Sequence, residues 1–396
     1  MLSISVPAPA RLALSVLLVA LLVSACGSRP TTGALAINTE PAAGAQDHDI
    51  LIVTTREKDP TPNTFFNGER SPTINYAEAT ISVPPTHKAG AVEWPRELPG
   101  NPKTDFVARK AGYIEDEQAF LRQLNQQLSE FPKGKRDVML FIHGYNTLFA
   151  EGLYRFTQFV HDSQAPVVPV LFTWASRGQL QGYVYDLNSA ALARDSLEQT
   201  FRLLAKSKAD SISILAHSMG NYLLLETARQ MPLAERRQFD RKVGSVVLAA
   251  PDIDIDLFKS SLRKLGKPPK PYIIVVSRDD KALRLSRAIA GGVERVGAYS
   301  DDEELAELGA IVFDVTELDA GETSSHSKFA ALAEYSPGLR DALLKSGLTD
   351  QNSVTGPKTL GDDLGSFVGN TTQAAVTLPI KIIAAPFTLA TGGSRQ

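Results

Sequence analysis

The chain has a single cysteine, Cys26, and almost no excess of either charge. One cysteine excludes an internal disulfide. With 41 basic and 44 acidic residues the net charge is −3, so bulk electrostatics predict no nucleic-acid partner. Hydrophobic residues make up 43% of the chain and charged residues 21%, which is typical of a globular protein with a large core.

Apolar runs long enough to span a membrane are also lacking. The run at residues 12–23 is too short for an ordinary span, and it has the charged start and small-residue end of a secretory signal. The apolar run at 376–390 is interrupted by two prolines and a lysine. It is expected to pack on the domain, with contact to a membrane surface as the alternative.

Residues 22–26, Leu-Val-Ser-Ala-Cys, resemble the lipobox of bacterial lipoproteins. This resemblance implies a signal peptide at 1–25 and lipidation of Cys26, which would be the membrane partner of the protein. Gly27, rather than an aspartate, directly follows the cysteine, and this resembles lipoproteins that are sorted to the outer membrane. The protein would there face the periplasm. A plain signal peptide with a chance cysteine is the alternative. Residues 26–48, rich in small residues, are expected to be a flexible tether.

Strands and helices are predicted to alternate from residue 137 onward. Strands are predicted at 138–142, 167–172, 212–215, 243–249, 272–276 and 310–315, and helices at 153–160, 189–204, 222–231 and 282–289. This alternation predicts an α/β fold with a mainly parallel central sheet and helices on both faces. Ligands in such a sheet bind beyond the carboxyl ends of the strands.

Three segments are predicted in the mature chain after the tether. An N-terminal extension at 49–136 is expected to pack on the core, with strands at 50–55 and 79–83 and a helix at 115–128. Its Pro-rich part, 60–103, is expected to be extended and irregular. The core is predicted at 137–345, and a C-terminal extension at 346–396.

Residues 216–220, Ala-His-Ser-Met-Gly, match the nucleophile-elbow pattern G-x-S-x-G with alanine at the first position. An apolar strand precedes the pattern and a helix pattern follows it. Ser218 is therefore expected in a strained strand-to-helix turn, which requires small flanking residues. A serine at an ordinary helix N-cap is the alternative interpretation.

A nucleophilic serine needs a base and an acid that orients the base. His326 is the predicted base because it follows the last strand. The other five histidines are less suitable. His48 and His87 precede the predicted core sheet, and His161 lies in a predicted helix. His217 adjoins Ser218 and should point away from it, and His143 ends a predicted strand.

Two adjacent carboxylates, Asp279 and Asp280, follow the strand at 272–276, and either is a candidate acid. Neighbouring turn residues point in different directions, so one is expected to reach His326 while the other faces solvent or caps the next helix. Asp252 is the next candidate. The order of nucleophile, acid and base is that of the α/β-hydrolases.

The predicted oxyanion hole uses the backbone N–H groups of Met219 and Tyr145. The segment 173–188 has two interpretations: a roof over the active site, or a surface loop whose aromatic residues pack inward.

Five stretches resemble a bacterial α/β-hydrolase family of unknown function, DUF900, which is of esterase/lipase type. They are Thr-Thr-Arg at 54–56, Phe-Ile-His-Gly-Tyr-Asn at 141–146, Phe-Thr-Trp at 172–174, Ala-His-Ser-Met-Gly-Asn at 216–221 and Ser-Arg-Asp-Asp-Lys-Ala-Leu at 277–283. The resemblance covers residues 50–330. In similar sequences the acid directly precedes a basic residue and Ala-Leu, which implies Asp280, with Asp279 as the alternative acid.

The expected function is a lipid-anchored serine hydrolase that cleaves a small-molecule or lipid carboxylic ester through an acyl-enzyme. The triad is Ser218, Asp280 and His326, and the expectation includes no metal and no organic cofactor. Two alternatives remain: a catalytically silent hydrolase fold that serves as an interaction module of the envelope, and a peptidase or acyltransferase with the same triad.

Overall fold

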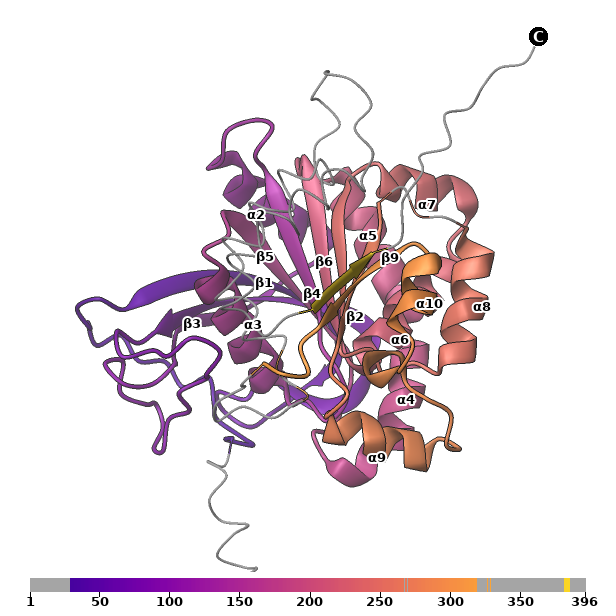
Figure 1. Cartoon of the computed structure of the whole chain (residues 1–396). Coiled ribbons are helices and arrows are strands. Elements are labelled where there is room, and N and C mark those ends of the chain that lie inside the picture. Colours follow the sequence, from indigo (N-terminus) through magenta and orange to yellow (C-terminus); the bar gives the residue numbers. More distant parts are fainter. Residues whose placement is uncertain are drawn as a thin grey trace, which may run out of the picture.

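One ten-stranded sheet organises the chain (Figure 1). The computed structural model describes residues 29–266, 268, 270–318, 326, 328 and 381–384. The strand order is β10-β9-β8-β7-β6-β4-β5-β1-β2-β3. The strands are β1 (Gln46–Lys58), β2 (Phe66–Val83), β3 (Val107–Ile114), β4 (Asp137–Ile142), β5 (Val167–Thr173), β6 (Ser211–His217), β7 (Val243–Ala249), β8 (Tyr272–Val276), β9 (Ala310–Asp314) and β10 (Lys381–Ala384).

The middle of the sheet is parallel, as the alternation of strands and helices predicts. All pairings from β1 through β5, β4, β6, β7 and β8 to β9 are parallel, and antiparallel strands lie only at the two edges. In register, Ile142 pairs with Ala216 and His217 pairs with Ala249. The loops that follow β4, β6 and β7 therefore leave the sheet at the same edge, where the candidate residues lie.

Helices cover both faces of the sheet (Figure 1). Leu140 and Ile142 face a core shared with α2, α5, α6 and α8, whereas Phe141 faces a second core shared with α3 and stacks on Phe156 at 5.2 Å. Alternate strand residues point to opposite faces, so a strand buried on both sides is apolar throughout. The helices are α2 (Glu117–Ser129), α3 (Phe149–Ser163), α4 (Tyr183–Leu192), α5 (Arg194–Lys206), α6 (Met219–Gln230), α7 (Leu233–Asp240), α8 (Ile255–Leu265), α9 (Lys281–Ile289) and α10 (Asp302–Glu307), with 3-10 turns η1 (Leu180–Gly182) and η2 (Val296–Ala298).

Two helix predictions need correction. The single helix expected at 189–204 is two helices, α4 and α5, which meet at Ala193. The helices α7 and α8 between β6 and β8 were not predicted. A local signal for α8 was nevertheless present, because the Asp254 carboxylate caps it by accepting from the N–H groups of Asp256 at 2.9 Å and Leu257 at 3.2 Å.

The predicted N-terminal extension contributes β1, β2 and β3 to the same sheet as the core. The strand predicted at 79–83 is present, but it begins much earlier, because 66–83 form the long strand β2. The expectation of irregular structure is therefore wrong for 66–78. A proline at position 72 is tolerated because the register of β1 and β2 shifts there: Thr54 pairs with Asn75, but Arg56 pairs with Arg70. The intervening residues form a bulge that requires no ladder hydrogen bond from proline.

The expected flexible tether, 26–48, also needs correction for the part that the structure describes. Ala34 and Leu35 are buried, and the Tyr154 hydroxyl on α3 donates to the Ala34 carbonyl at 2.7 Å. Ile37 forms a β-bridge with Ala108. Small residues suggested a linker, but the apolar ones among them pack against α3 and β3. The signal peptide at 1–25 and Cys26 lie outside the described residues.

In the C-terminal extension the structure describes residues 381–384, which form β10. This strand pairs antiparallel with β9, with Lys381 opposite Asp314. The remaining residues of the apolar run at 376–390 lie outside the described part. Among the helices that the structure describes, none is both long and apolar enough to cross a bilayer.

Candidate active site

Ser218 forms the turn between β6 and α6, with φ 53° and ψ −123°. A positive φ is rare for serine, and such a conformation costs on the order of 1–3 kcal/mol. The strand, strained turn and helix expected around Ser218 are present. The alternative, an ordinary N-cap, does not hold, because within the described chain the Ser218 side chain makes no capping hydrogen bond to α6.

Hydrogen bonds to the backbone of Ser218 hold this turn. Its N–H donates to the Ala249 carbonyl at 3.0 Å, and its carbonyl accepts from the Asp252 N–H at 3.2 Å. The buried amide of Asn221 donates to both carbonyls, at 3.0 Å to Ser218 and 3.1 Å to Ala249. Sequence reasoning missed this role of Asn221, because one of its two partners, Ala249, lies on a different strand.

Two glycines allow the backbone to approach the turn closely. A Cβ on Gly220 would lie 2.5 Å from the His143 carbonyl oxygen, and a Cβ on Gly144 would lie 2.6 Å from the Ser218 Cβ. Both separations are shorter than any normal contact, so each position requires glycine. Ala216, which replaces the first glycine of the pattern, is fully buried in the regular part of β6 and needs no special freedom.

The structure brings His326 and Asp280 together. His326 Nδ1 lies 2.7 Å from Asp280 Oδ2. The other oxygen of this buried carboxylate, Oδ1, caps α9 by accepting from the N–H groups of Ala282 at 2.9 Å and Leu283 at 3.0 Å. Sequence reasoning treated contact with the histidine and capping as alternatives, whereas Asp280 does both with different oxygens.

Asp279 points elsewhere, as expected for a neighbouring turn residue. Its carboxylate accepts from Lys328 Nζ at 2.8 Å and from Ser277 Oγ at 2.5 Å, and its side chain is 46% exposed. The alternative acid is therefore engaged with Lys328 and not with His326.

His217 packs against the predicted base. Its Nε2 lies 3.1 Å from the His326 carbonyl oxygen, and the two rings are 4.6 Å apart. Burial, followed by the proximity of His326, lowers the pKa of His217 well below its ordinary value. A neutral His217 therefore adds no positive charge beside His326. The sequence predicted only that His217 adjoins Ser218 and points away from it, and this contact with His326 was not predicted.

The loop after β4 carries Tyr145, whose N–H is the second predicted oxyanion donor. Among the described residues we find no acceptor for the N–H of Tyr145 or of Met219. The Tyr145 hydroxyl donates to the Leu180 carbonyl. Next to it, the Asn146 N–H donates to the buried carboxylate of Asp186 at 3.0 Å. The loop is thus anchored by side-chain contacts, and neither predicted donor is bonded to another described residue.

Arg56, fully buried at the end of β1, binds the same loop. Its five N–H groups face five acceptors: Thr173 Oγ1 at 2.8 Å, the carbonyls of Asn67 at 3.1 Å, Ser176 at 2.8 Å and Thr147 at 2.7 Å, and His143 Nε2 at 3.3 Å. Burial lowers the pKa of Arg56 to about 10, so it stays charged at neutral pH. A buried charge is tolerated only when it is hydrogen-bonded, and here every donor is used.

His143, at the end of β4, belongs to this network and not to the catalytic chemistry. Burial, and then the nearby Arg56, lowers the pKa of His143 to about 3, so the ring is neutral. Its Nδ1 donates to the Gly144 carbonyl at 2.8 Å, and its Nε2 accepts from Thr173 Oγ1 at 2.9 Å. The ring therefore joins the turn at Gly144 to the end of β5.

The segment 173–188 packs its aromatic residues inward, which favours the second of its two interpretations. Trp174 is fully buried and stacks on His143 at 4.9 Å, and Tyr183 packs edge-on against Tyr145 at 5.1 Å. The same segment exposes two apolar side chains, Leu180 at 61% and Val184 at 63%. It therefore borders the loop that carries Tyr145 and presents two exposed apolar side chains among polar ones.

Asp252, the third candidate acid, belongs to a buried network of hydrogen bonds and one ion pair. It accepts from Ser286 Oγ at 2.5 Å and Tyr183 Oη at 3.2 Å, and Arg295 Nε lies 3.3 Å away. This network ties α4 and α9 to the loop after β7. It gives Asp252 a structural role that does not involve orienting His326.

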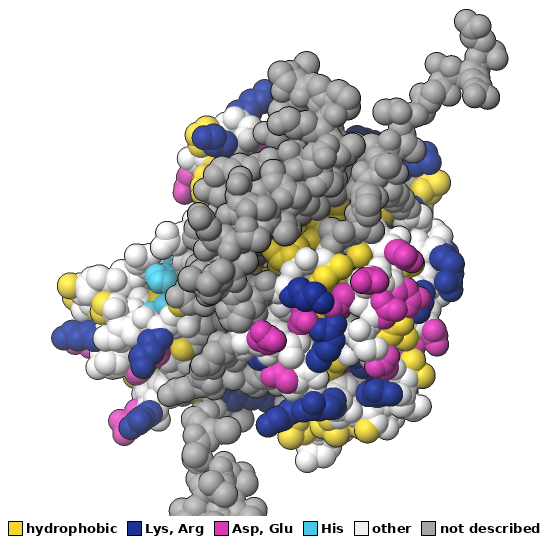
Figure 2. Space-filling view, in the orientation of Figure 1, with side chains coloured by type: hydrophobic (Ala, Val, Ile, Leu, Met, Phe, Trp, Pro, Cys, Tyr) yellow, Lys and Arg dark blue, Asp and Glu magenta, His cyan; other side chains and the backbone are white. Residues whose placement is uncertain are grey.

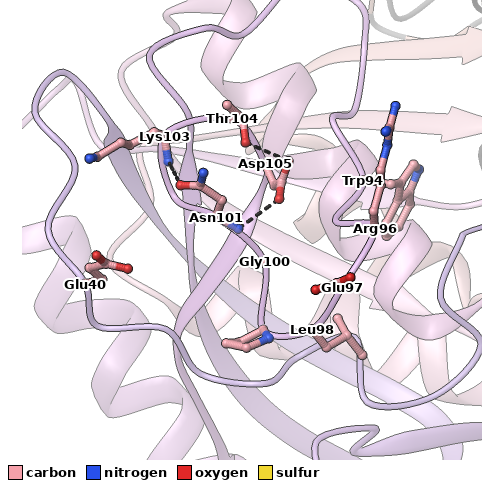
Figure 3. Close-up of a pocket in the computed structure, with 11 residues that line it drawn as sticks. Glu40, Trp94, Arg96, Glu97, Leu98, Gly100, Asn101, Lys103, Thr104 and Asp105 are labelled. Carbon is pink, nitrogen blue, oxygen red and sulfur yellow. Dashed lines mark hydrogen bonds between the residues drawn. The ribbon is translucent and has the colours of Figure 1, made fainter.

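A cavity of about 840 Å³ lies away from these residues, in the connection between β2 and β3 (Figure 3). Its wall includes Trp94, Leu98 and Asp105, and none of the predicted site residues lines it. His48, His87 and His161 also lie apart from Ser218, and they contact one another.

The chain matches one family model. The family model described as "Alpha/beta hydrolase of unknown function (DUF900)" matches residues 116–344, which is more than half of the chain. A search of curated proteins found no match.

Solved structures of low similarity include three esterases or lipases. An esterase from Rhizomucor miehei is 12% identical, with 82% of this chain and 90% of that chain covered and a TM-score of 0.32. Aspergillus fumigatus lipase B is 16% identical, with 71% and 73% covered and a TM-score of 0.34. The Pyrobaculum calidifontis esterase is 12% identical, with 75% and 87% covered and a TM-score of 0.28. Similarity at this level carries no inference about activity.

Replacing Gly220 with alanine should distort the elbow. The new Cβ would meet backbone oxygens of Ile142 and His143 at 2.6 Å and 2.5 Å, which cannot move without shifting β4. We expect a loss of about 1–3 kcal/mol in the free energy of unfolding, measured by denaturant titration. Gly112→Ala is the matched control, because its Cβ would meet nothing closer than 3.8 Å. Equal stability of the two variants would contradict the close approach.

Exchanging each of the two adjacent carboxylates should separate their roles. Asp280→Asn keeps an oxygen that can cap α9, so melting temperature should change little. Turnover should fall by roughly 10⁴-fold, because an amide no longer fixes the His326 tautomer or balances its charge. Asp279→Asn, the matched control, should change turnover less than about threefold, since the Asp279 carboxylate contacts Lys328 and Ser277 and not His326. A large loss in Asp279→Asn with normal turnover in Asp280→Asn would reverse the assignment.

Proposed function

Because the chain belongs to the DUF900 family of α/β-hydrolases, we propose that it is a serine hydrolase that cleaves carboxylic esters through an acyl-enzyme on Ser218. One observation carries this proposal: the strained turn at Ser218 lies at the same sheet edge as a histidine whose Nδ1 is 2.7 Å from the buried Asp280. Strain of this kind persists where it serves a function, and here it holds the serine in place for attack.

In the proposed mechanism His326 is the base. Asp280 accepts a hydrogen bond from the Nδ1–H of the ring, which leaves Nε2 free to take the proton of Ser218 Oγ as the hydroxyl attacks the ester carbon. The ester carbonyl oxygen becomes an oxyanion, which the N–H groups of Met219 and Tyr145 stabilise. His326 then gives its proton to the departing alcohol. A water molecule, activated by the same ring, hydrolyses the acyl-enzyme and restores Ser218.

The surroundings of the site favour an ester with an apolar acyl group. Leu180 and Val184 expose most of their side chains, and the Leu180 carbonyl is held by the hydroxyl of Tyr145. An exposed apolar surface next to an oxyanion donor provides a place for an acyl chain, since burying apolar area contributes about 25 cal/mol per Å².

Lipid anchoring through Cys26, at the outer membrane and facing the periplasm, is part of the proposal. A hydrolase anchored there meets the lipid esters of the same membrane, which favours such an ester as substrate. In the described part of the chain the Arg29 guanidinium donates to the Asn146 carbonyl and to the Gly178 carbonyl, each at 2.9 Å. Arg29 therefore lies beside the loop that carries Tyr145.

Ser218→Ala should abolish hydrolysis of a short-chain aryl ester by the purified protein. Removal of a triad nucleophile costs on the order of 10⁴-fold or more in turnover. Ser213→Ala, in the same strand β6, is the matched control and should keep normal kcat/KM. Undiminished hydrolysis by Ser218→Ala would refute the assignment. Absence of turnover in the wild type over a panel of acyl-chain lengths would instead support a silent interaction module.

Cys26 should carry acyl chains in cells that have an outer membrane. Mass spectrometry of the N-terminal peptide is expected to show a lipidated Cys26, and fractionation should place the protein with the outer membrane. Several acyl chains hold a protein stably, whereas one binds only marginally. Cys26→Ala should block processing, and Thr32→Ala should not. An unmodified wild-type N-terminus at Gly27 or beyond would overturn the anchor without affecting the hydrolase proposal.

A further inference from the structure

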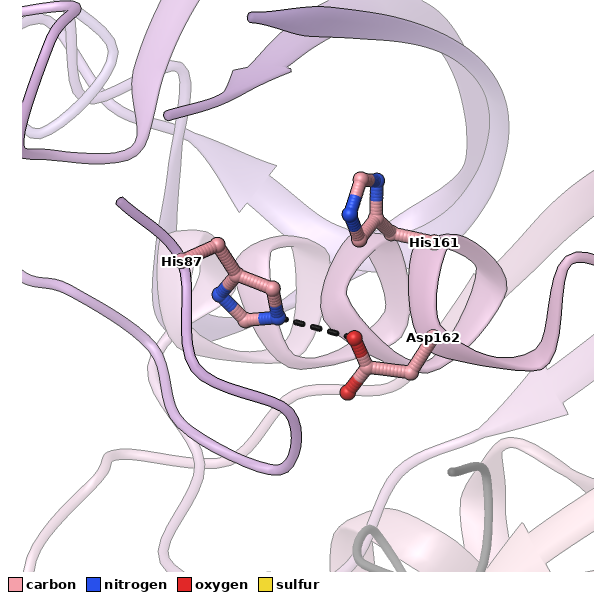
Figure 4. A group of neighbouring side chains, drawn as sticks. All are labelled: His87, His161 and Asp162. Atoms are coloured by element: carbon pink, nitrogen blue, oxygen red, sulfur yellow. Dashed lines mark hydrogen bonds and ion pairs between the residues drawn. The ribbon is translucent and has the colours of Figure 1, made fainter. Parts of the chain in front are cut away.

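Three of the six histidines lie together, far from Ser218 in the sequence. His48 comes from β1, His87 from the connection after β2, and His161 from the last turn of α3, where Asp162 follows it (Figure 4). One potential ligand atom from each of His87, His161 and Asp162 lies within 4.8 Å of the other two. The fold thus collects two imidazoles and a carboxylate from segments that are separated in the chain.

We propose that His87, His161 and Asp162 form a binding site for one Zn²⁺ ion or a similar divalent transition-metal ion. Two histidines and one carboxylate are a donor set that Zn²⁺ binds, with a fourth position open to water or a further ligand. The site is separate from the proposed hydrolase centre and takes no part in the acyl-enzyme chemistry.

The contacts of His87 leave one ring nitrogen for the metal. Its Nδ1 is 2.8 Å from Glu93 Oε2, and its Nε2 is 2.8 Å from Asp162 Oδ1. Glu93 therefore orients the ring from behind, while Nε2 faces the other ligand. A carboxylate on the far nitrogen of a metal-binding histidine is a common arrangement, because it fixes the tautomer and increases the basicity of the ligating nitrogen.

His161 and Asp162 are held in the same manner. His161 Nδ1 is 3.0 Å from His48 Nε2, so its Nε2 is left for the metal. Asp162 Oδ2 accepts from the Gly90 N–H at 2.7 Å and from Gln158 Nε2 at 2.5 Å, which leaves Oδ1 as the ligand oxygen. Each proposed ligand therefore has an outer partner on the atom that would not bind the ion.

A metal ion at this cluster requires the ligand atoms to rearrange. The ligand atom of His161, within 4.8 Å of the other two, would approach them by up to about 1.5 Å. At Zn²⁺ bond lengths of about 2.0–2.1 Å, two tetrahedral ligand atoms lie roughly 3.3 Å apart. His87 Nε2 and Asp162 Oδ1, now 2.8 Å apart, would separate by about half an ångström. The ion would replace the proton shared by these two atoms, so binding of one Zn²⁺ releases a proton.

The cluster lies just below the surface. His87, His161 and Asp162 are residues of intermediate exposure, but the His87 side chain is only 7% exposed and the Asp162 side chain 3%. Histidine atoms are visible on the side of the molecule where β1–β3 lie (Figure 2). An ion there would join the β2–β3 connection to α3. Binding to the folded state alone raises stability in proportion to the logarithm of the metal concentration.

Metal binding by the full chain, purified without a polyhistidine tag and stripped by a chelator, tests the proposal. Calorimetric titration with Zn²⁺ should show one equivalent bound, and melting temperature should rise with Zn²⁺ concentration. His87→Gln should weaken binding by at least about 100-fold, and Glu93→Gln by about 10- to 100-fold. Glu97→Gln, the same exchange at an exposed position of the same connection, should bind like the wild type, as should Ser218→Ala.

The opposing result is equally definite. The proposal is refuted if the wild-type protein binds no stoichiometric ion and its melting temperature does not rise with Zn²⁺. The cluster would then be only an ion pair of His87 with two carboxylates. Stoichiometric binding that survives His87→Gln would place the ion elsewhere. Should the variant fail to fold, Co²⁺ added to the wild type decides: visible bands of four-coordinate Co²⁺ support the site, and the weak spectrum of hydrated Co²⁺ overturns it.

Discussion

The strained backbone at Ser218 is the constraint on which the rest of the site depends. A serine at φ 53° costs on the order of 1–3 kcal/mol, and hydrogen bonds worth about 1 kcal/mol each offset that cost. They involve Asn221 of α6, Ala249 at the end of β7 and Asp252 in the loop after β7. Glycine at 144 follows from the same constraint, because any larger residue would collide with the Ser218 side chain.

The loop that faces Ser218 depends on a second interaction, the buried guanidinium of Arg56. Its acceptors include Thr173, Ser176 and Thr147, so one side chain fixes the residues that follow β4 and β5. A lysine has three donors on one atom and cannot satisfy five acceptors spread over a plane. Tyr145 is thereby held at the sheet edge where Ser218 emerges.

Sequence reasoning found the features that local patterns encode. The elbow at Ser218 and the parallel strands were predictable, because each depends on a short run of residues. The length of β2 was not, since a proline within a bulge looks the same as a proline in a loop. The contact of Asp280 with His326 and four of the five contacts of Arg56 were also beyond prediction, because they join segments more than 40 residues apart. The DUF900 resemblance is confirmed by the family match.

The central claim is that Ser218 is a nucleophile activated by His326. It is tested most directly by treating the folded wild-type protein with a fluorophosphonate and locating the adduct by peptide mass spectrometry. The account predicts one adduct per chain, on Ser218, and none after denaturation, when the strained turn at Ser218 and the contact of His326 with Asp280 are lost. An adduct on another serine, or none on the folded protein, would contradict it.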